Sequence, residues 1–135
     1  MTPVVFDGNV VLAAIGWGGT ARLCLKLAVK RRLLLCVTTS ILSEYEAVVP
    51  ERLREEMPGL DPHPKLAWIR AKSRLVGPAP LGKQRSRDPK DDQYLACALA
   101  ARARYIVSYD EDLLALKKPF GIEIIRPAEL LRRLG

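Results

Sequence analysis

Several acidic side chains lie where a strand is expected to end or a helix to begin. These positions are Asp7, Glu44, Asp88, Asp91, Asp92, Asp110 and Asp112. A carboxylate buried at such a position is costly unless it is paired or bound to a metal. The chemistry of this chain therefore depends on which acids have a local structural role and which do not.

Two of these acids have such a role. Asp88 precedes Pro89 and is a typical N-cap, and Asp91 at the third helical position interacts favourably with the helix dipole. Asp92 lies one turn into the same helix, on the side of Leu95 and Leu99, so we expect it to point towards the sheet. Glu44 similarly lies one turn into its own expected helix.

Four carboxylates, Asp7, Glu44, Asp92 and Asp110, are then expected to converge on one edge of a sheet. Carboxylates so close together would repel one another and raise one another's pKa values, and a hard divalent cation removes that penalty. Carboxylate ligands suit Mg²⁺ or Mn²⁺ better than zinc or copper. The acids therefore predict a magnesium or manganese site.

Other catalytic chemistries lack the residues they need. The only histidine, His63, lies between two prolines, which disfavours a Ser-His or Cys-His nucleophile. No Cys-x-x-Cys spacing supports zinc, and no phosphate-binding loop of the Walker type is present. The three cysteines lie among apolar neighbours and are expected to be buried free thiols.

The charge of the chain favours a polyanionic partner. The formal net charge is +7, and the basic residues Lys83, Arg85, Arg87 and Lys90 come just before Asp91. Basic side chains beside an acidic pocket suit a phosphodiester that is held by its backbone next to a metal. A second basic cluster, Lys26, Lys30, Arg31 and Arg32, is equally well explained as a solvated helix end.

Short apolar strands alternate with helices along the chain. Strands are expected at 3–7, 33–37, 74–76, 105–108 and 122–125, and helices at 10–15, 20–28, 41–49 with a continuation to 57, 65–72, 88–103, 111–116 and 128–134. This order predicts an α/β fold, a three-layer α/β/α sandwich with a central parallel sheet. In such sheets, sites form at the carboxyl ends of the strands, where Asp7 and Asp110 are expected.

The length and composition of the chain limit the class of protein. At 135 residues the chain is expected to form one domain, residues 1–135, and its 49% hydrophobic content is ordinary for a globular protein. No apolar run approaches the roughly 20 residues needed to span a bilayer, and no secretory signal is apparent. We therefore expect a cytoplasmic protein without a membrane partner.

The order of these motifs resembles the PIN-domain ribonucleases. The stretches that carry the resemblance are a strand followed by Asp7-Gly8-Asn9, then 40-SILSEYEAV-48, 88-DPKDDQYLACALAARARYIVSYDEDLL-114 and 121-GIEIIRPAELL-131. The resemblance is greatest to the branch identified as toxins of toxin–antitoxin pairs, related to the VapC-type toxins. It covers nearly the whole chain, but residues 50–84 match only in length and in their content of Pro and Gly.

The resemblance implies an Mg²⁺- or Mn²⁺-dependent endoribonuclease that hydrolyses single-stranded RNA, with a cognate antitoxin and a homodimer as possible partners. It implies Asp7, Glu44, Asp92 and Asp110 as the catalytic and metal-binding acids. Asn9 and Ser108 would support them, and the adjacent acids Asp91 and Asp112 could take the place of two of them. The family usually has Thr or Ser where this chain has Gly8, so one hydroxyl near the metal is missing from the motif.

Two other functions remain open. The stretch 5-VFDGNV-10 superficially resembles the opening motif of haloacid-dehalogenase-type phosphatases, but that chemistry needs an aspartate where this chain has Asn9. The second is a non-catalytic PIN-like scaffold that binds RNA or a partner without cutting. A metal requirement separates this scaffold from the nuclease.

Overall fold

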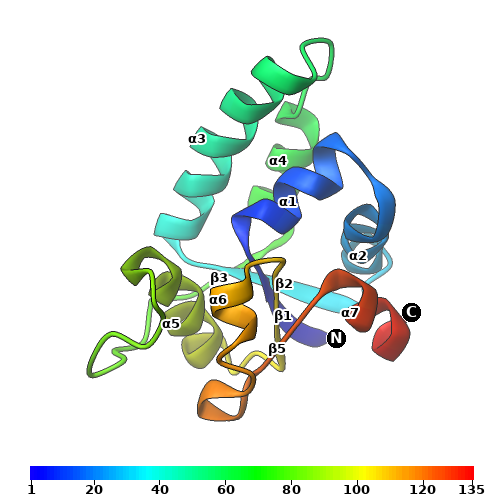
Figure 1. Ribbon diagram of the computed structural model, residues 1–135. Helices are drawn as coiled ribbons and strands as arrows, with labels where there is room; N and C mark the ends of the chain where they lie inside the picture. Colours follow the sequence, from blue (N-terminus) through cyan, green and yellow to red (C-terminus); the bar gives the residue numbers. More distant parts are fainter.

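A five-stranded parallel sheet forms the centre of the protein, which is described by a computed structural model covering residues 1–135 (Figure 1). The strand order is β3-β2-β1-β4-β5, and every neighbouring pair is parallel. The strands are β1 (Thr2–Phe6), β2 (Leu33–Val37), β3 (Arg74–Leu75), β4 (Tyr105–Val107) and β5 (Glu123–Ile125). The three residues of β4 are fully buried, as expected for strands covered on both faces.

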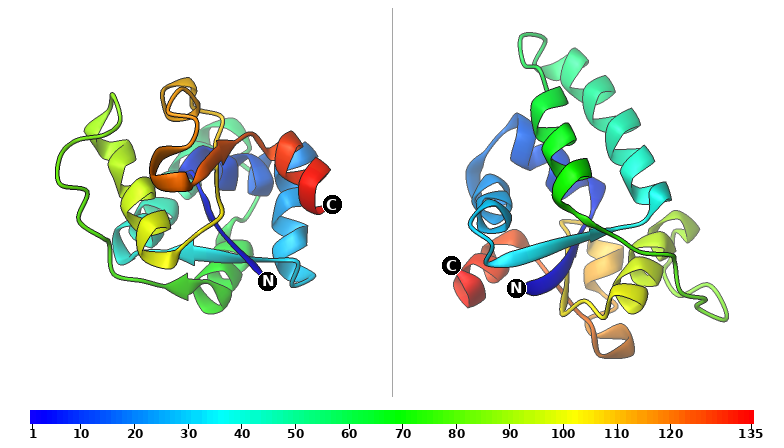
Figure 2. Two further views of the ribbon diagram at one scale, coloured as in Figure 1. Left: turned by 90° about the horizontal axis from the view of Figure 1, so that it is seen from below. Right: turned by 180° about the vertical axis from the view of Figure 1, so that it is seen from behind.

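Helices cover both faces of this sheet, so the predicted α/β fold is confirmed (Figures 1 and 2). They are α1 (Gly8–Gly16), α2 (Gly19–Val29), α3 (Thr39–Glu56), α4 (His63–Lys72), α5 (Asp92–Ala101), α6 (Glu111–Leu114) and α7 (Pro127–Leu134), with short 3₁₀ turns η1 (Pro89–Asp91) and η2 (Pro119–Gly121). Helix α1 packs on α2 and α3, and α7 packs on α2. Helix α5 contacts β1, β2 and β4 and lies on the opposite face (Figures 1 and 2).

The chain changes direction across the sheet between β1 and β4. From β1 it proceeds to β2 and β3 on one side, and it returns to β4 and β5 on the other. Ligand sites in open parallel sheets form at this kind of switch point, beyond the carboxyl ends of the strands. Phe6 pairs with Val107, so the residues that follow these two strands lie side by side.

The helix starts agree with the sequence at some positions and differ at others. Thr38 caps α3, because its hydroxyl accepts a hydrogen bond of 3.2 Å from the Ile41 N–H. The helix expected at 20–28 begins one residue earlier, and Gly18 with φ 85° takes the N-cap position without a side-chain bond. Helix α3 also continues through Pro50 as one helix.

All three cysteines are buried and free, which confirms the expectation for them. No single helix is long and apolar enough to cross a membrane. Helices α1 and α2 together pass that test by length and composition, but they are bent by 97° where they meet.

Candidate metal-dependent nuclease site

Asp7 and Asp110 are linked at the carboxyl ends of β1 and β4 through the hydroxyl of Ser108. Ser108 Oγ donates to Asp7 Oδ2 at 2.6 Å and accepts from the Asp110 N–H at 2.9 Å. Asp7 is 6% exposed and Ser108 is completely buried. The hydroxyl thus holds two acids from separate parts of the chain in one place, as the parallel register requires.

Both acids also begin a helix. Asp7 is the N-cap of α1 and its Oδ1 accepts from the Asn9 N–H at 3.2 Å. Asp110 is the N-cap of α6 and its Oδ1 accepts from the N–H groups of Asp112 and Leu113 at 2.8 and 3.2 Å. Each carboxylate therefore keeps one oxygen bound to backbone, while the other is free of helix contacts.

Glu44 reaches the same site from α3 and is held there by two side chains of α5. Tyr94 Oη donates to Glu44 Oε2 at 2.9 Å, and the side-chain amide of Gln93 donates to the same oxygen. Tyr94 Oη also accepts from the Gly8 N–H at 3.2 Å, and Tyr94 is only 3% exposed. The tyrosine hydroxyl thus connects Glu44 to the turn that carries Asp7.

Tyr94 was not among the residues predicted for the site, because its place in an apolar run indicates a core residue. Its position also accounts for Gly8. A Cβ at residue 8 would lie 3.3 Å from Tyr94 Oη, so the hydroxyl occupies space next to the glycine. A hydroxyl therefore lies beside the Asp7 turn although residue 8 itself has none.

The fourth acid of the site is Asp91, and the expectation that Asp92 points towards the sheet edge is wrong. Asp92 accepts hydrogen bonds from the backbone N–H groups of Arg85 and Ser86 at 3.0 and 2.7 Å, and from Ser86 Oγ at 2.5 Å. It therefore fastens the preceding loop. A 3₁₀ turn occupies residues 89–91, and α5 begins only at Asp92 instead of at the expected residue 88. Asp88 caps this 3₁₀ turn, accepting from the Lys90 N–H at 3.0 Å.

One open cavity of about 230 Å³ is lined by five acids, Asp7, Glu44, Asp88, Asp91 and Asp110. Its polar lining consists of Asp7, Asn9, Glu44, Asp88, Lys90, Asp91, Tyr94 and Asp110, together with the Gly8 backbone. Lys90 is the one cationic side chain among them. The cavity therefore has a strong excess of negative charge.

Two of these acids, Asp7 and Asp91, have raised pKa values. Burial raises the pKa of Asp7, and Asp110 and Glu44 add to that rise, while the bonds from Ser108 and Asn9 oppose it. Burial, with the charges of Asp110, Asp7, Asp88 and Asp112, raises the pKa of Asp91 to about 6. A cation in the cavity would favour the ionised form of both carboxyl groups.

The donor set fits a hard divalent cation by its chemistry, since it consists of carboxylate oxygens with one amide nearby. As the side chains stand, however, no three acids are grouped closely enough to hold one ion. Asp91 makes no capping bond and can turn towards an ion, whereas Glu44 and Asp110 are held by the hydrogen bonds described above. The residues that would hold it are Asp7, Glu44, Asp91 and Asp110.

Of the residues predicted to contact RNA, only Lys90 is part of the cavity lining. Arg87 lies 3.9 Å from Asp112 with most of its side chain exposed. Arg85 instead donates to the Leu81 carbonyl and lies over the ring of Phe120, 5.1 Å from its centre. Lys83 is exposed in the same loop. Asn9 is exposed at the mouth of the cavity.

A family model described as a PIN domain matches residues 3–112, which is most of the chain. The chain belongs to the PIN-domain family. PIN domains are generally nucleases, and the matched segment contains every acid of the cavity. The resemblance stated from the motifs is confirmed at this level.

A solved structure shows the same fold. The crystal structure of PAE2754 from Pyrobaculum aerophilum is similar over 98% of this chain and 89% of that chain, with a TM-score of 0.64 and 19% identity. At this identity the likeness establishes the PIN-like fold alone. A search of curated proteins found no significant match.

Proposed function

We propose that this PIN domain is an endoribonuclease that hydrolyses phosphodiester bonds of single-stranded RNA with Mg²⁺ or Mn²⁺. The observation that carries the proposal is the joining of Asp7 and Asp110 by Ser108, with Glu44 and Asp91 in the same cavity. The raised pKa values of Asp7 and Asp91 add support, because a bound cation would offset the burial and the repulsion that raise them.

The roles of the residues follow from their contacts. Asp7, Glu44, Asp91 and Asp110 would hold the cation, which when bound lowers the pKa of a water and stabilises charge on the phosphate. Ser108 fixes the orientation of Asp7, and Tyr94 and Gln93 fix that of Glu44. Lys90 at the cavity and the exposed Arg87 would attract the RNA backbone. No histidine base is needed.

The test is cleavage of an unstructured RNA with and without Mn²⁺. Asp7→Asn keeps the size of the side chain and removes its charge, so we expect it to lower the rate by a factor of about 100 or more. Glu55→Gln is the matched control, because Glu55 is exposed on α3 and makes no ion pair. Equal cleavage by the wild type and Asp7→Asn would refute the assignment.

A scaffold that binds without cutting is the second candidate, and the wide spacing of the acids favours it. Calorimetric titration with Mn²⁺ separates the two. A nuclease should bind the cation at the acidic cavity and lose that binding in Asp7→Asn. A scaffold should bind RNA equally well in a chelator.

We further propose that the nuclease is the toxin of a toxin–antitoxin pair, on the strength of the motif resemblance. Production of the wild type in cells should then arrest growth, and Asp7→Asn should not. A small protein encoded next to this gene should restore growth when it is produced together with the wild type. Growth arrest by both forms of the chain would contradict this proposal.

A further inference from the structure

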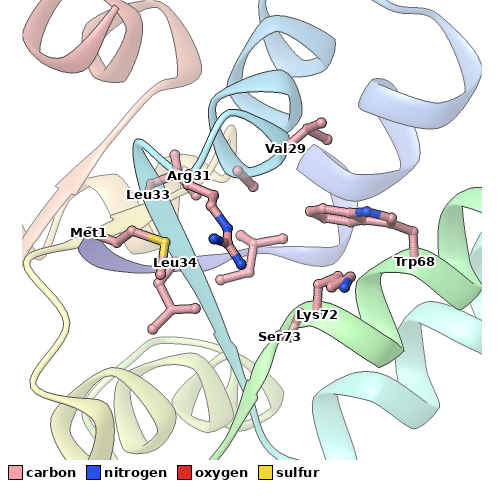
Figure 3. A pocket seen from close by; sticks show the side chains of 10 residues that line it. Met1, Val29, Arg31, Leu33, Leu34, Trp68, Lys72 and Ser73 are labelled. Atoms are coloured by element: carbon pink, nitrogen blue, oxygen red, sulfur yellow. The ribbon is translucent and has the colours of Figure 1, made fainter.

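A second concave surface lies between β2 and the helices α2 and α4, away from the acidic cavity (Figure 3). Its first part is a cavity of about 280 Å³ lined mainly by apolar side chains, among them Val29, Leu34 and Trp68. Two cationic side chains, Arg31 and Lys72, also line it. Figure 3 shows the Arg31 side chain extending between β2 and Trp68.

An adjoining cavity of about 380 Å³ shares Val29 and Trp68 with the first and continues between the two helices. Leu25 and Val29 are one turn apart on α2, and Pro64 and Trp68 are one turn apart on α4. The two cavities together form the α2–α4 groove. Two apolar ridges at helical spacing leave a space between them into which the ridge of a third helix can pack.

The charge of this groove is entirely positive. Its cationic side chains are Arg22, Lys26, Arg31, Lys65 and Lys72, and no acidic residue lines either cavity. None of the five belongs to an ion pair, whereas Arg70 on the same α4 pairs with Glu46. Burial, followed by the charges of Arg22 and Lys26, lowers the pKa of Lys65.

We propose that the α2–α4 groove binds an acidic amphipathic helix of a partner protein. Apolar side chains of that helix would cover Val29, which is 57% exposed, and Trp68, while Glu or Asp side chains would pair with the flanking cations. No residue lines both this groove and the acidic cavity, so the proposal does not depend on the nuclease assignment.

The form of the groove favours a helix over two other occupants. A single-stranded nucleic acid stacks its bases on successive exposed aromatic rings, but Trp68 is the one aromatic residue here and it is partly buried against the core. A second copy of this chain also carries a net charge of +7, so the two copies would repel each other at this face. A negatively charged partner removes both difficulties.

The test uses the fluorescence of Trp68 in the otherwise complete chain carrying Trp17→Phe, so that a single tryptophan reports. The probe is a designed helical peptide of about 15 residues, with leucines along one face and glutamates beside them. Its control has lysine in place of every glutamate. A second probe is an unstructured RNA of the same length.

Two charge-reversal variants with equal change in net charge complete the design. Lys26→Glu with Lys65→Glu alters the groove, and Lys83→Glu with Arg87→Glu alters the loop beside the acidic cavity. We expect the acidic peptide to bind about tenfold more weakly to the groove variant and equally well to the loop variant. The groove variant should unfold at the same temperature as the wild type, which shows that the variant is folded.

Truncation of the aromatic contact is an independent measurement. Trp68→Ala should weaken peptide binding by a factor of about 30, measured by anisotropy of a labelled peptide. The proposal is overturned if the acidic peptide shows no saturable binding up to about 1 mM. It is also overturned if the lysine peptide or the RNA binds the groove as tightly as the acidic peptide does. The same holds if the wild type is a dimer in solution and the groove variant is a monomer.

Discussion

Replacing Gly8 with alanine tests whether the Tyr94 hydroxyl holds the acidic cavity together. The new Cβ would lie 3.3 Å from Tyr94 Oη, which is closer than nearly all such contacts in proteins. The hydroxyl has little freedom to move away, because it bonds to the Gly8 N–H at 3.2 Å and to Glu44 Oε2 at 2.9 Å. Tyr94 is also buried, so the helix behind it does not yield easily.

The magnitudes can be worked from these contacts. Overpacking a tight site costs about 1–3 kcal/mol, and alanine in place of helical glycine recovers about 0.5–1 kcal/mol. Gly8→Ala should therefore lower the free energy of unfolding by about 1 kcal/mol. Tyr94→Phe removes one neutral hydrogen bond and one to a partly exposed carboxylate, which together contribute about 2 kcal/mol.

The two changes should not be additive. Without the hydroxyl nothing opposes the new Cβ, so in the Tyr94→Phe background we expect Gly8→Ala to be neutral or to stabilise by about 0.5 kcal/mol. The difference is a coupling energy of about 1–1.5 kcal/mol, well above the error for independent sites.

Urea denaturation of the four proteins at constant pH measures this coupling, provided that the slope of the free energy with urea stays the same. Gly59→Ala is the matched control, because a Cβ there meets nothing within 4 Å. Additive effects of the two changes, within about 0.5 kcal/mol, would refute the account of Tyr94 and Gly8 given above.

Three further predictions concern the acids and the thiols. Asp91→Asn should remove Mn²⁺-dependent cleavage, while Asp92→Asn should keep it but lower stability by about 1 kcal/mol through its bonds to Ser86 and Arg85; the opposite order in cleavage and thermal-unfolding assays would contradict the geometry. Folding raises the pKa of Asp91 from 3.8 to about 6, so between these pH values the folded state binds more protons than the unfolded state. The free energy of unfolding should therefore fall as the pH rises from about 4 to about 6. Unfolding measurements without metal should show a smaller fall for Asp91→Asn. Burial raises the pKa of Cys24 and Cys97 to about 12, so a thiol reagent should modify neither in the native protein at neutral pH and both after unfolding.

Local patterns in the sequence predict the sheet and two of its acids. The apolar runs that form β1 and β4 are short, continuous and bounded by polar residues, so the ends of both strands can be read from the chain. A parallel sheet brings such ends together, which places Asp7 near Asp110. Ser108 belongs to the same local pattern, and its bond to Asp7 follows from the register.

The choice between Asp91 and Asp92 depends on information that is not local. A Pro at the first helical position is compatible with an α-helix or with a 3₁₀ turn, and the two point the next acids in different directions. The loop at Arg85 and Ser86 decides the matter, because its N–H groups need an acceptor and Asp92 supplies it. Helical periodicity alone cannot show such a bond.

Tyr94 illustrates the same limit over a longer range. Its hydroxyl partners are 86 and 50 residues away in the chain, and an aromatic residue between Gln93 and Leu95 looks like a core position. The α2–α4 groove was equally hidden, since of the second basic cluster only Lys26 and Arg31 line it. Its other cations are Arg22 on α2 and Lys65 and Lys72 on α4, and α4 lies beside α2 only in the folded protein.

In the polar stretch that follows β1, the residues have other roles than the motif suggests. Asp7 carries the charge, the Asn9 N–H fixes one of its oxygens, and the hydroxyl beside the turn comes from α5. Because that hydroxyl also bonds Glu44, any movement of α5 would shift Asp7 and Glu44 together. A side chain at position 8 would crowd that hydroxyl, since its Cβ would lie 3.3 Å from Tyr94 Oη, and glycine leaves both contacts undisturbed.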